Sequence, residues 1–322
     1  MRLIAWIALV LTAAGCGEST GPLKDLSELR TSVAVVNTVF ASPLVHSLGV
    51  FRFGGPLAAP AAGALLIPDS LLGKTLAFTC ASQRYAESGD SGAPATGVRV
   101  VLYRRAPDGS IACPATAIGQ LDLFDASAPS TTAVRGVGTG PGGSGPLVDY
   151  TISHNVADAQ GVATATGFLT DGQQRLDFQV TGEPGSGLNN TIATVQLDDA
   201  AADLHAVLHH AAQMGVDTYS DDLDLSVQHA AGSAELKGSV GWANTLRSWD
   251  EIVSVNDAPF AKVGGSFVPE NEGPSISPIG GRFFFTGEER RVLLDFVGAP
   301  DSIRAGLAGV LGAGAHLVRI AL

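Results

Sequence analysis

Apolar and polar residues alternate along the second half of the chain. The alternation is clearest in Leu176–Val180, Leu223–Val227 and Leu236–Trp242. A period of two buries one face of a strand and leaves the other in water, which is typical of antiparallel sheets. The segments predicted to be strands are Val148–Asn155, Val162–Leu169, Arg175–Thr181, Thr191–Leu197, Leu204–Ala211, Leu223–His229, Ala234–Trp242 and Trp249–Val255.

Turn residues separate these segments, and Asp171-Gly172 is typical of a tight hairpin turn. Sequential strands at regular spacing favour a meander. The sequence therefore predicts a mainly β fold, in which an antiparallel meander forms a sandwich or a partly closed barrel with one N-terminal amphipathic helix.

That helix is predicted over Leu23–Phe40, where apolar residues recur at helical spacing. We expect it to pack on the sheet. The alternative, a helix lying on a lipid surface, would need a polar face rich in lysine and arginine, which this segment lacks.

The first half of the chain predicts a smaller β region, with strands at Thr75–Cys80, Gly97–Tyr103 and Ser110–Cys113. A glycine-dense loop, Gly138–Pro146, follows. We take the loop as an approximate boundary between residues 23–137 and residues 147–322. The alternative is one continuous domain.

The C-terminal segment predicts mixed structure. Arg282–Thr286 and Arg291–Phe296 suggest a hairpin around Gly287-Glu288. Ile303–Leu311 suggests one short helix, weakened by its glycines by about 1 kcal/mol each relative to alanine. His316–Leu322 suggests a closing strand.

The start of the chain carries a targeting signal. Met1-Arg2 is basic, Leu3–Ala13 is apolar, and Ala14-Gly15 precedes Cys16. The apolar run, about eleven residues long, is shorter than the roughly twenty needed to span a bilayer, and it suits a signal peptide. An ordinary secretory peptide cut near Gly15 is the alternative.

The ending Leu11–Cys16 resembles the lipobox of bacterial lipoproteins, although Ala13 stands where that family usually has leucine. The resemblance covers only residues 1–16. It implies a signal peptide over residues 1–15, lipid on Cys16 and a tether over residues 16–22. Gly17, where aspartate would mark inner-membrane retention, implies delivery to the outer membrane, on its periplasmic or outer side.

Composition narrows the partners. The formal net charge is −12, and it becomes −13 if Arg2 leaves with the signal peptide. An acidic protein repels phosphate backbones, so nucleic-acid binding is disfavoured. The partners that we expect are the membrane, through the lipid, and an envelope protein or an apolar ligand.

Two cysteines remain beside Cys16, namely Cys80 and Cys113. Exported chains meet an oxidising compartment, so a disulfide is expected. Closing a loop of this size would stabilise the fold by about 3–4 kcal/mol. The alternative is two buried free thiols.

The segment Gly89–Pro94 resembles the nucleophile segment of chymotrypsin-like serine proteases, departing from it at Ala93. That family places a histidine segment before the serine. Here His46 is the only histidine before Ser91, and its surroundings differ from the family's histidine segment. Because serine is a weak nucleophile without a positioned base, we expect a polar turn. The loop Gly138–Gly145 lacks the lysine of a phosphate-binding loop.

Two clusters are weak candidates for metal binding. His205 and His209 share a face on either a helix or a strand, but Ala206 stands where zinc proteases of the zincin type have glutamate. Asp217, Asp221, Asp222 and Asp224 form an acidic cluster without the glycine and glutamate of a calcium loop. We expect solvated or core side chains, and neither a metal nor another cofactor.

The leading hypothesis is a non-enzymatic lipoprotein with a binding or structural role in the cell envelope. The second is a carrier of lipid or another apolar ligand in a half-open barrel covered by the N-terminal helix. The third is a hydrolase whose site the sequence does not reveal. A cavity of several hundred cubic ångströms would favour ligand binding.

Overall fold

A computed structural model describes residues 22–51, 66–106, 108–143, 145–155, 161–184, 190–230, 232–243, 246–267, 274–279 and 284–318. Its main feature is one open sheet of 15 strands in the order β15-β14-β13-β12-β11-β10-β9-β8-β7-β6-β5-β4-β3-β1-β2. Neighbouring strands are antiparallel except β1 and β3, which are parallel. The mainly β fold class is confirmed, and the meander is a single curved sheet.

The strands cover most of the chain. Their bounds are β1 Lys74–Thr79, β2 Arg84–Ser88, β3 Gly97–Tyr103, β4 Ala117–Asp125, β5 Thr131–Thr139, β6 Pro146–Asn155, β7 Ala163–Thr170, β8 Arg175–Pro184, β9 Asn190–Asp199, β10 Leu204–Met214, β11 Thr218–His229, β12 Gly232–Ala243, β13 Leu246–Val255, β14 Ala258–Phe267 and β15 Ser275–Pro278.

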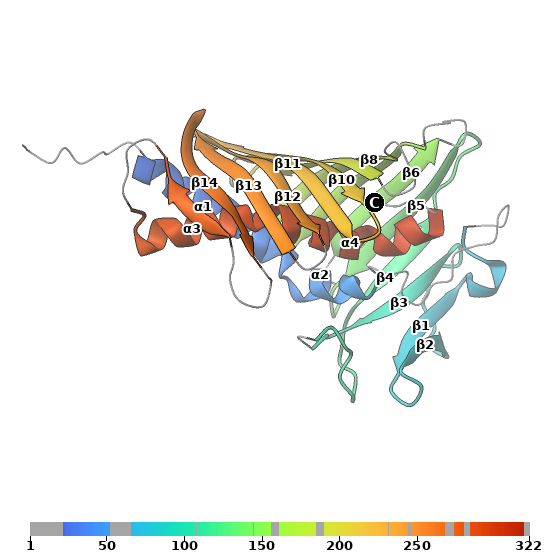
Figure 1. Ribbon diagram of the computed structural model, residues 1–322. Helices are drawn as coiled ribbons and strands as arrows, with labels where there is room; N and C mark the ends of the chain where they lie inside the picture. Colours follow the sequence, from blue (N-terminus) through green and yellow to red (C-terminus); the bar gives the residue numbers. More distant parts are fainter. Residues whose placement is uncertain are drawn as a thin grey trace, which may run out of the picture.

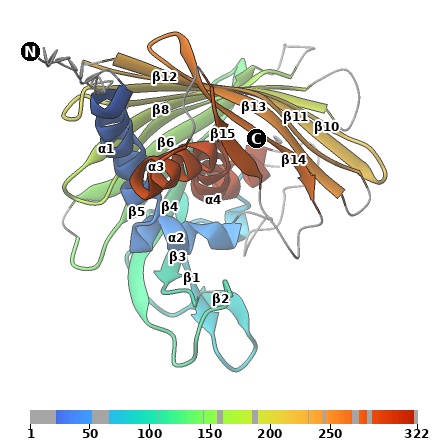
Figure 2. The ribbon, with the colours of Figure 1, turned by 60° about the vertical axis from the view of Figure 1, so that its left-hand side comes forward.

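Helices lie on the concave side of the sheet. They are α1 Pro22–Phe40, α2 Pro43–Leu48, α3 Gly287–Val297 and α4 Ala299–Val318, with short 3-10 turns at Gly49–Phe51 and Asp69–Leu71. Figure 1 shows α4 lying along the trough of the sheet, and Figure 2 shows α1, α2 and α3 around it. The strands β1 and β2 extend away from this layer.

The alternation of the sequence explains the two faces of the sheet. In β11 the residues Leu223, Leu225 and Val227 are buried, while the residues between them face the convex side. The same alternation buries Leu176 and Phe178 in β8. Burying apolar area at about 25 cal/mol per Å² is the main force that holds the helices in the trough.

The N-terminal helix packs as expected. Leu29, Val33, Val36 and Val39 of α1 are buried, and α1 contacts α3, α4 and the strands β8, β11 and β12. No single described helix is long and apolar enough to cross a membrane, although the bent pair Leu29–Phe40 and Pro43–Phe51 meets the length and hydropathy criteria.

Glycines let the helices approach closely. A Cβ atom on Gly309 of α4 would lie 3.2 Å from the Cα of Gly49, and one on Gly306 would overlap the ring of Phe40. The expected cost of glycine in a helix is therefore offset by tight packing, and α4 extends well beyond the predicted helix over Ile303–Leu311.

The predicted C-terminal hairpin of Arg282–Thr286 and Arg291–Phe296 is wrong over the described residues, because 284–286 form no strand; Arg282 and Phe283 lie outside the described chain. Arg291–Phe296 lies in α3, which begins at a capping box formed by Thr286 and Glu289. Val292, Leu293 and Phe296 are buried at helical spacing. The predicted closing strand His316–Leu322 is also wrong over residues 316–318, which end α4, and its last residues lie outside the described chain.

The remaining expectations for the first half are mostly met. Cys80 and Cys113 form a disulfide with their Cα atoms 5.9 Å apart. The predicted strand Ser110–Cys113 is wrong, because only Ile111 makes an isolated bridge, to Arg105. The sheet continues across the glycine-dense loop, since β5 pairs with β6.

Candidate functional site

The concave face becomes polar at one end of β11, β12 and β13. The row Leu225, Leu236 and Val253 is apolar and buried. Toward the start of β11, paired residues follow in the order Leu223–Gly238–Glu251, Asp221–Val240–Trp249 and Tyr219–Trp242–Arg247. The side chains at all of these positions lie on the concave face of the sheet.

The start of α4 supplies the opposite wall. Arg304 is ion-paired with Asp221 of β11 and with Asp301 one turn earlier in α4. Asp221 is fully buried, and the side chain of Arg304 is 25% exposed. The pair therefore ties α4 to the sheet in a partly desolvated place, where losing one partner is costly.

Asp221 has two further neighbours. The hydroxyl of Tyr219 donates to its Oδ2 at 2.9 Å, and Nδ1 of His210 lies 3.5 Å from its Oδ1. Burial, and then the charge of Arg304, lower the pKa of His210 to about 4. His210 is therefore neutral at pH 7, and Arg304 is the cation that compensates Asp221.

Asp221 pairs with Arg304, although its Oδ1 atom has no hydrogen-bond partner. Glu251 is 1% exposed, and its Oε2 atom has no hydrogen-bond partner either. Burial, and then the negative charge of Asp301, raise the pKa of Glu251 to about 7. A carboxyl group in this state is ready to accept a hydrogen bond or a cation.

A pocket of about 440 Å³ opens between these walls. Its described lining includes Glu251, Arg247 and the rings of Tyr219, Trp242 and Trp249. Tyr219 and Trp242 stack with their ring centroids 4.1 Å apart. Aromatic faces with a few convergent charged groups are typical of a small-molecule site of this size.

The residues singled out from the sequence lie mostly elsewhere. Nδ1 of His205 is 2.6 Å from Oδ1 of Asp198, and His209 is hydrogen-bonded to Thr194 at 2.9 Å; both histidines face the convex side. No described histidine, cysteine or acidic side chains gather in a group of three that could hold a metal ion.

The acidic cluster is split by the pleat of β11. Lys237 donates to Asp224 at 2.9 Å on the convex side, where Asp222 is also exposed. Asp221 points the other way, to Arg304. Asp217 is exposed beyond the start of the strand. The sequence places these four residues together, but the pleat and the turn separate their side chains.

Ser91 lies in an exposed loop between β2 and β3, whereas His46 belongs to α2. The polar turn expected for this segment agrees with that exposure. The glycine-dense loop joins two antiparallel strands, which agrees with the rejection of a phosphate-binding loop.

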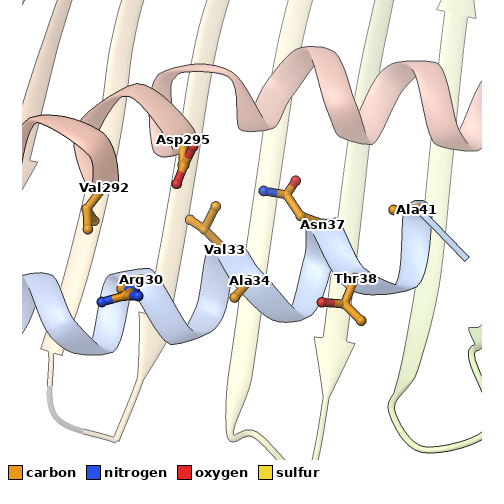
Figure 3. Close-up of a pocket in the computed structure, with 8 residues that line it drawn as sticks. All are labelled: Arg30, Val33, Ala34, Asn37, Thr38, Ala41, Val292 and Asp295. Carbon is orange, nitrogen blue, oxygen red and sulfur yellow. The ribbon is translucent and has the colours of Figure 1, made fainter. Parts of the chain in front are cut away.

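A second hollow, of about 400 Å³, lies between α1 and α3. Figure 3 shows Arg30, Asn37 and Asp295 among the side chains along it. Arg30 donates to Glu288 at 2.6 Å, and both side chains are mostly exposed. Its described lining contains no buried polar atom without a partner, so it is the weaker candidate.

The sequence contains a signal for the pocket beside Glu251, namely two acidic residues at inward-facing positions of strands. Asp221 has the same parity as Leu223, and Glu251 the same parity as Val253. A charged residue that continues the apolar face of a strand must be buried or must line a cavity. The partners from α4 could not be found in this way, because its contacts depend on the tertiary fold.

No family model, curated protein or solved structure matches this chain. The arguments about its function therefore depend on its own residues.

Proposed function

We propose that this protein is a non-catalytic binding protein of the cell envelope, anchored by lipid on Cys16, that takes a small organic ligand into the pocket between β11–β13 and the α3–α4 junction. The observation that carries the binding role is the buried, unpartnered Oε2 atom of Glu251.

A buried polar group without a partner costs about 1–3 kcal/mol, and most such groups in proteins are satisfied. Glu251 faces the pocket, so a ligand that donates a hydrogen bond would remove this cost. The group therefore favours a bound state over an empty one.

The lining supports binding more than catalysis. It has no serine, threonine, cysteine, lysine or histidine among the described residues. Its arginine side chains face acidic groups, since Arg304 pairs with Asp221 and Asp301, and Arg247 acts on Asp301. These contacts are suited to holding and orienting a ligand.

The lining also favours a small ligand over a lipid. Along the trough, α4 already covers the apolar concave face with Leu307, Val310 and Leu311. A long acyl chain would have to displace this helix. The pocket beside Glu251 combines charged and aromatic groups with apolar side chains such as Leu223 and Val240.

The envelope location is supported by the signal at residues 1–16. Cys16 lies outside the described residues. The tether from Gly17 to α1 reaches at most about 20 Å when extended, so the sheet would stay close to its membrane. Stable anchoring would come from two or more acyl chains, at about 0.8 kcal/mol per buried methylene.

Mass spectrometry tests the binding role. The protein is isolated from the cells that produce it, and the small molecules that leave it on denaturation are identified. We expect a molecule that is abundant in wild type and in the convex-face variant Ile252→Ala, and depleted in Glu251→Gln and Trp249→Ala. Equal amounts in all four proteins would contradict a site in this pocket.

Metabolic labelling tests the anchor separately. A radioactive palmitate analogue should label wild type and should not label Cys16→Ser, which should also leave the membrane fraction. An unlabelled wild type would contradict the envelope part of the proposal without affecting the pocket.

A further inference from the structure

We propose that the ligand of this pocket is an organic monocation, whose ammonium group pairs with Glu251 and whose apolar body lies against Trp242 and Trp249. The inference depends on the proposed binding role and specifies the chemical class of the ligand.

The charges around the pocket are one cation short. Its described lining and the side chains in contact with that lining hold three carboxyl groups, on Asp221, Glu251 and Asp301, but only two guanidinium groups, on Arg247 and Arg304. His210 adds no charge at pH 7, because its pKa is lowered to about 4. A ligand with one positive charge would balance the site.

Glu251 is the carboxyl group of this site that has no paired cation among the described residues. Arg304 is already held by Asp221 and Asp301. Burial raises the pKa of Asp301, and the charge of Arg247 opposes this rise, so Arg247 already acts on Asp301. Oδ1 of Asp221 and Oε2 of Glu251 are both buried without a hydrogen bond, but Asp221 is already paired with Arg304. An ammonium group is small, carries up to three donors and suits a single buried carboxylate.

The aromatic rings of the pocket also favour a cationic ligand. Trp249 precedes Glu251 by two residues on the inner face of β13, and Trp242 lies diagonally from Trp249 on β12, opposite Arg247. The face of a tryptophan attracts a cation within about 6 Å of its centroid and also provides apolar contact area. An anion would instead meet Glu251 and Asp301, which repel it.

The pocket provides its own spectroscopic probe. The chain has three tryptophans, Trp6, Trp242 and Trp249. Trp6 belongs to the proposed signal peptide, so in the processed protein all tryptophan fluorescence comes from residues that line the pocket. Titrations with benzylamine, benzyl alcohol and benzoate compare a cation, a neutral molecule and an anion of almost the same shape.

We expect benzylamine to bind roughly tenfold to a hundredfold more tightly than the other two compounds, as a charge-assisted hydrogen bond to a buried group requires. Glu251→Gln should abolish this preference and leave the weak binding of benzyl alcohol unchanged. Asp250→Asn is the matched control, because Asp250 is the preceding residue and pairs with Lys262 on the convex side.

The pH dependence distinguishes pairing with Glu251 from a merely structural role of that residue. Benzylamine should bind more tightly as pH rises from 6 to 8, because the carboxyl must lose its proton to pair with the cation. In Glu251→Gln this slope should disappear. Asp301, Arg247, Arg304, Tyr219 and His210 stay in place in both proteins, so the difference reports Glu251 alone.

Other outcomes overturn the inference in recognisable ways. If benzyl alcohol or benzoate binds as tightly as benzylamine, the ligand class is wrong while the pocket still binds. If no probe binds and the molecule released from the isolated protein is neutral or anionic, the inference fails and the binding role stands. If no probe binds and nothing is released, both fail.

Discussion

The two ends of α4 lie against the same sheet in opposite ways. The C-terminal half buries Val310, Leu311 and Leu317 against an apolar surface, and it contacts β5 and β6. In the N-terminal half, Arg304 pairs with Asp221 of β11 and with Asp301 of α4 itself. One helix therefore joins a packed core to a charged pocket.

The two ends of α4 differ in how they contribute to stability: the apolar end favours folding, and the buried Glu251 at the charged end opposes it. At the apolar end, close contact of α4 with the sheet is favourable at every point. At the charged end, the sheet buries Asp221 and Glu251, and Glu251 lacks a hydrogen bond on one oxygen. Leucine at position 251 would fold as well or better, whereas Asp221 is required by its pair with Arg304. The charge of Glu251 therefore indicates a function.

The largest expected effect is at the apolar end. Leu311→Ala should lower the free energy of unfolding by about 3–4 kcal/mol, because Leu311 is almost fully buried and a cavity would remain. Urea denaturation measures this loss, which should be the same at pH 5 and pH 8. Leu294→Ala, on an exposed part of α3, should cost much less.

Breaking the ion pair should have the next largest effect. Asp221→Ala leaves Arg304 partly buried beside Tyr219, and we expect a loss of about 3 kcal/mol. Asp222→Ala, whose side chain is exposed on the convex side, should change stability by less than about 0.5 kcal/mol. Equal effects of the two substitutions would show that the pair with α4 is unimportant.

Removing the unpartnered carboxyl should have the opposite sign. Burial raises the folded-state pKa of Glu251 from its ordinary value of 4.5 to about 7. Its contribution to stability is therefore fully present below pH 4.5 and is lost as pH rises through 7. Glu251→Gln should stabilise the protein by about 2 kcal/mol at pH 8, and by less as the pH falls toward 4.5.

Chemical denaturation at several pH values checks this prediction. His210 has a lowered pKa and therefore destabilises in acid, but it is present in both proteins and cancels in the difference. A Glu251→Gln protein that is less stable than wild type at pH 8 would show that the carboxylate is a structural requirement.

The smallest expected effect is on the outside of the same strands. Lys237 and Asp224 form an exposed pair at 2.9 Å, and Lys237→Ala should leave the stability almost unchanged at moderate salt. A loss as large as that of Asp221→Ala in urea denaturation would show that the convex side also carries an important charge network.

The sequence was informative wherever one rule decides the structure. Strict alternation predicted β8, β11 and β12, and Asp171-Gly172 predicted the turn between β7 and β8. Compartment and cysteine count predicted the disulfide between Cys80 and Cys113. These features depend on local geometry or on a single pair of residues.

Prediction failed where a local pattern has two solutions. Arg291–Phe296 is a short apolar and charged segment that suits either a strand or a helix, and the capping box at Thr286 decides for the helix. The glycines of α4 suggested a weak helix, but they allow contact with Gly49 and Phe40. The site was missed because Arg304 and Asp221 meet only in the folded chain.

A crystal structure of the protein isolated from its producing cells, without refolding, tests the pocket most directly. We predict electron density for an organic molecule with a nitrogen atom within hydrogen-bonding distance of Oε2 of Glu251, and with its body against Trp249. Ordered water alone at that carboxylate, with an organic molecule bound at another place on the protein, would contradict the account.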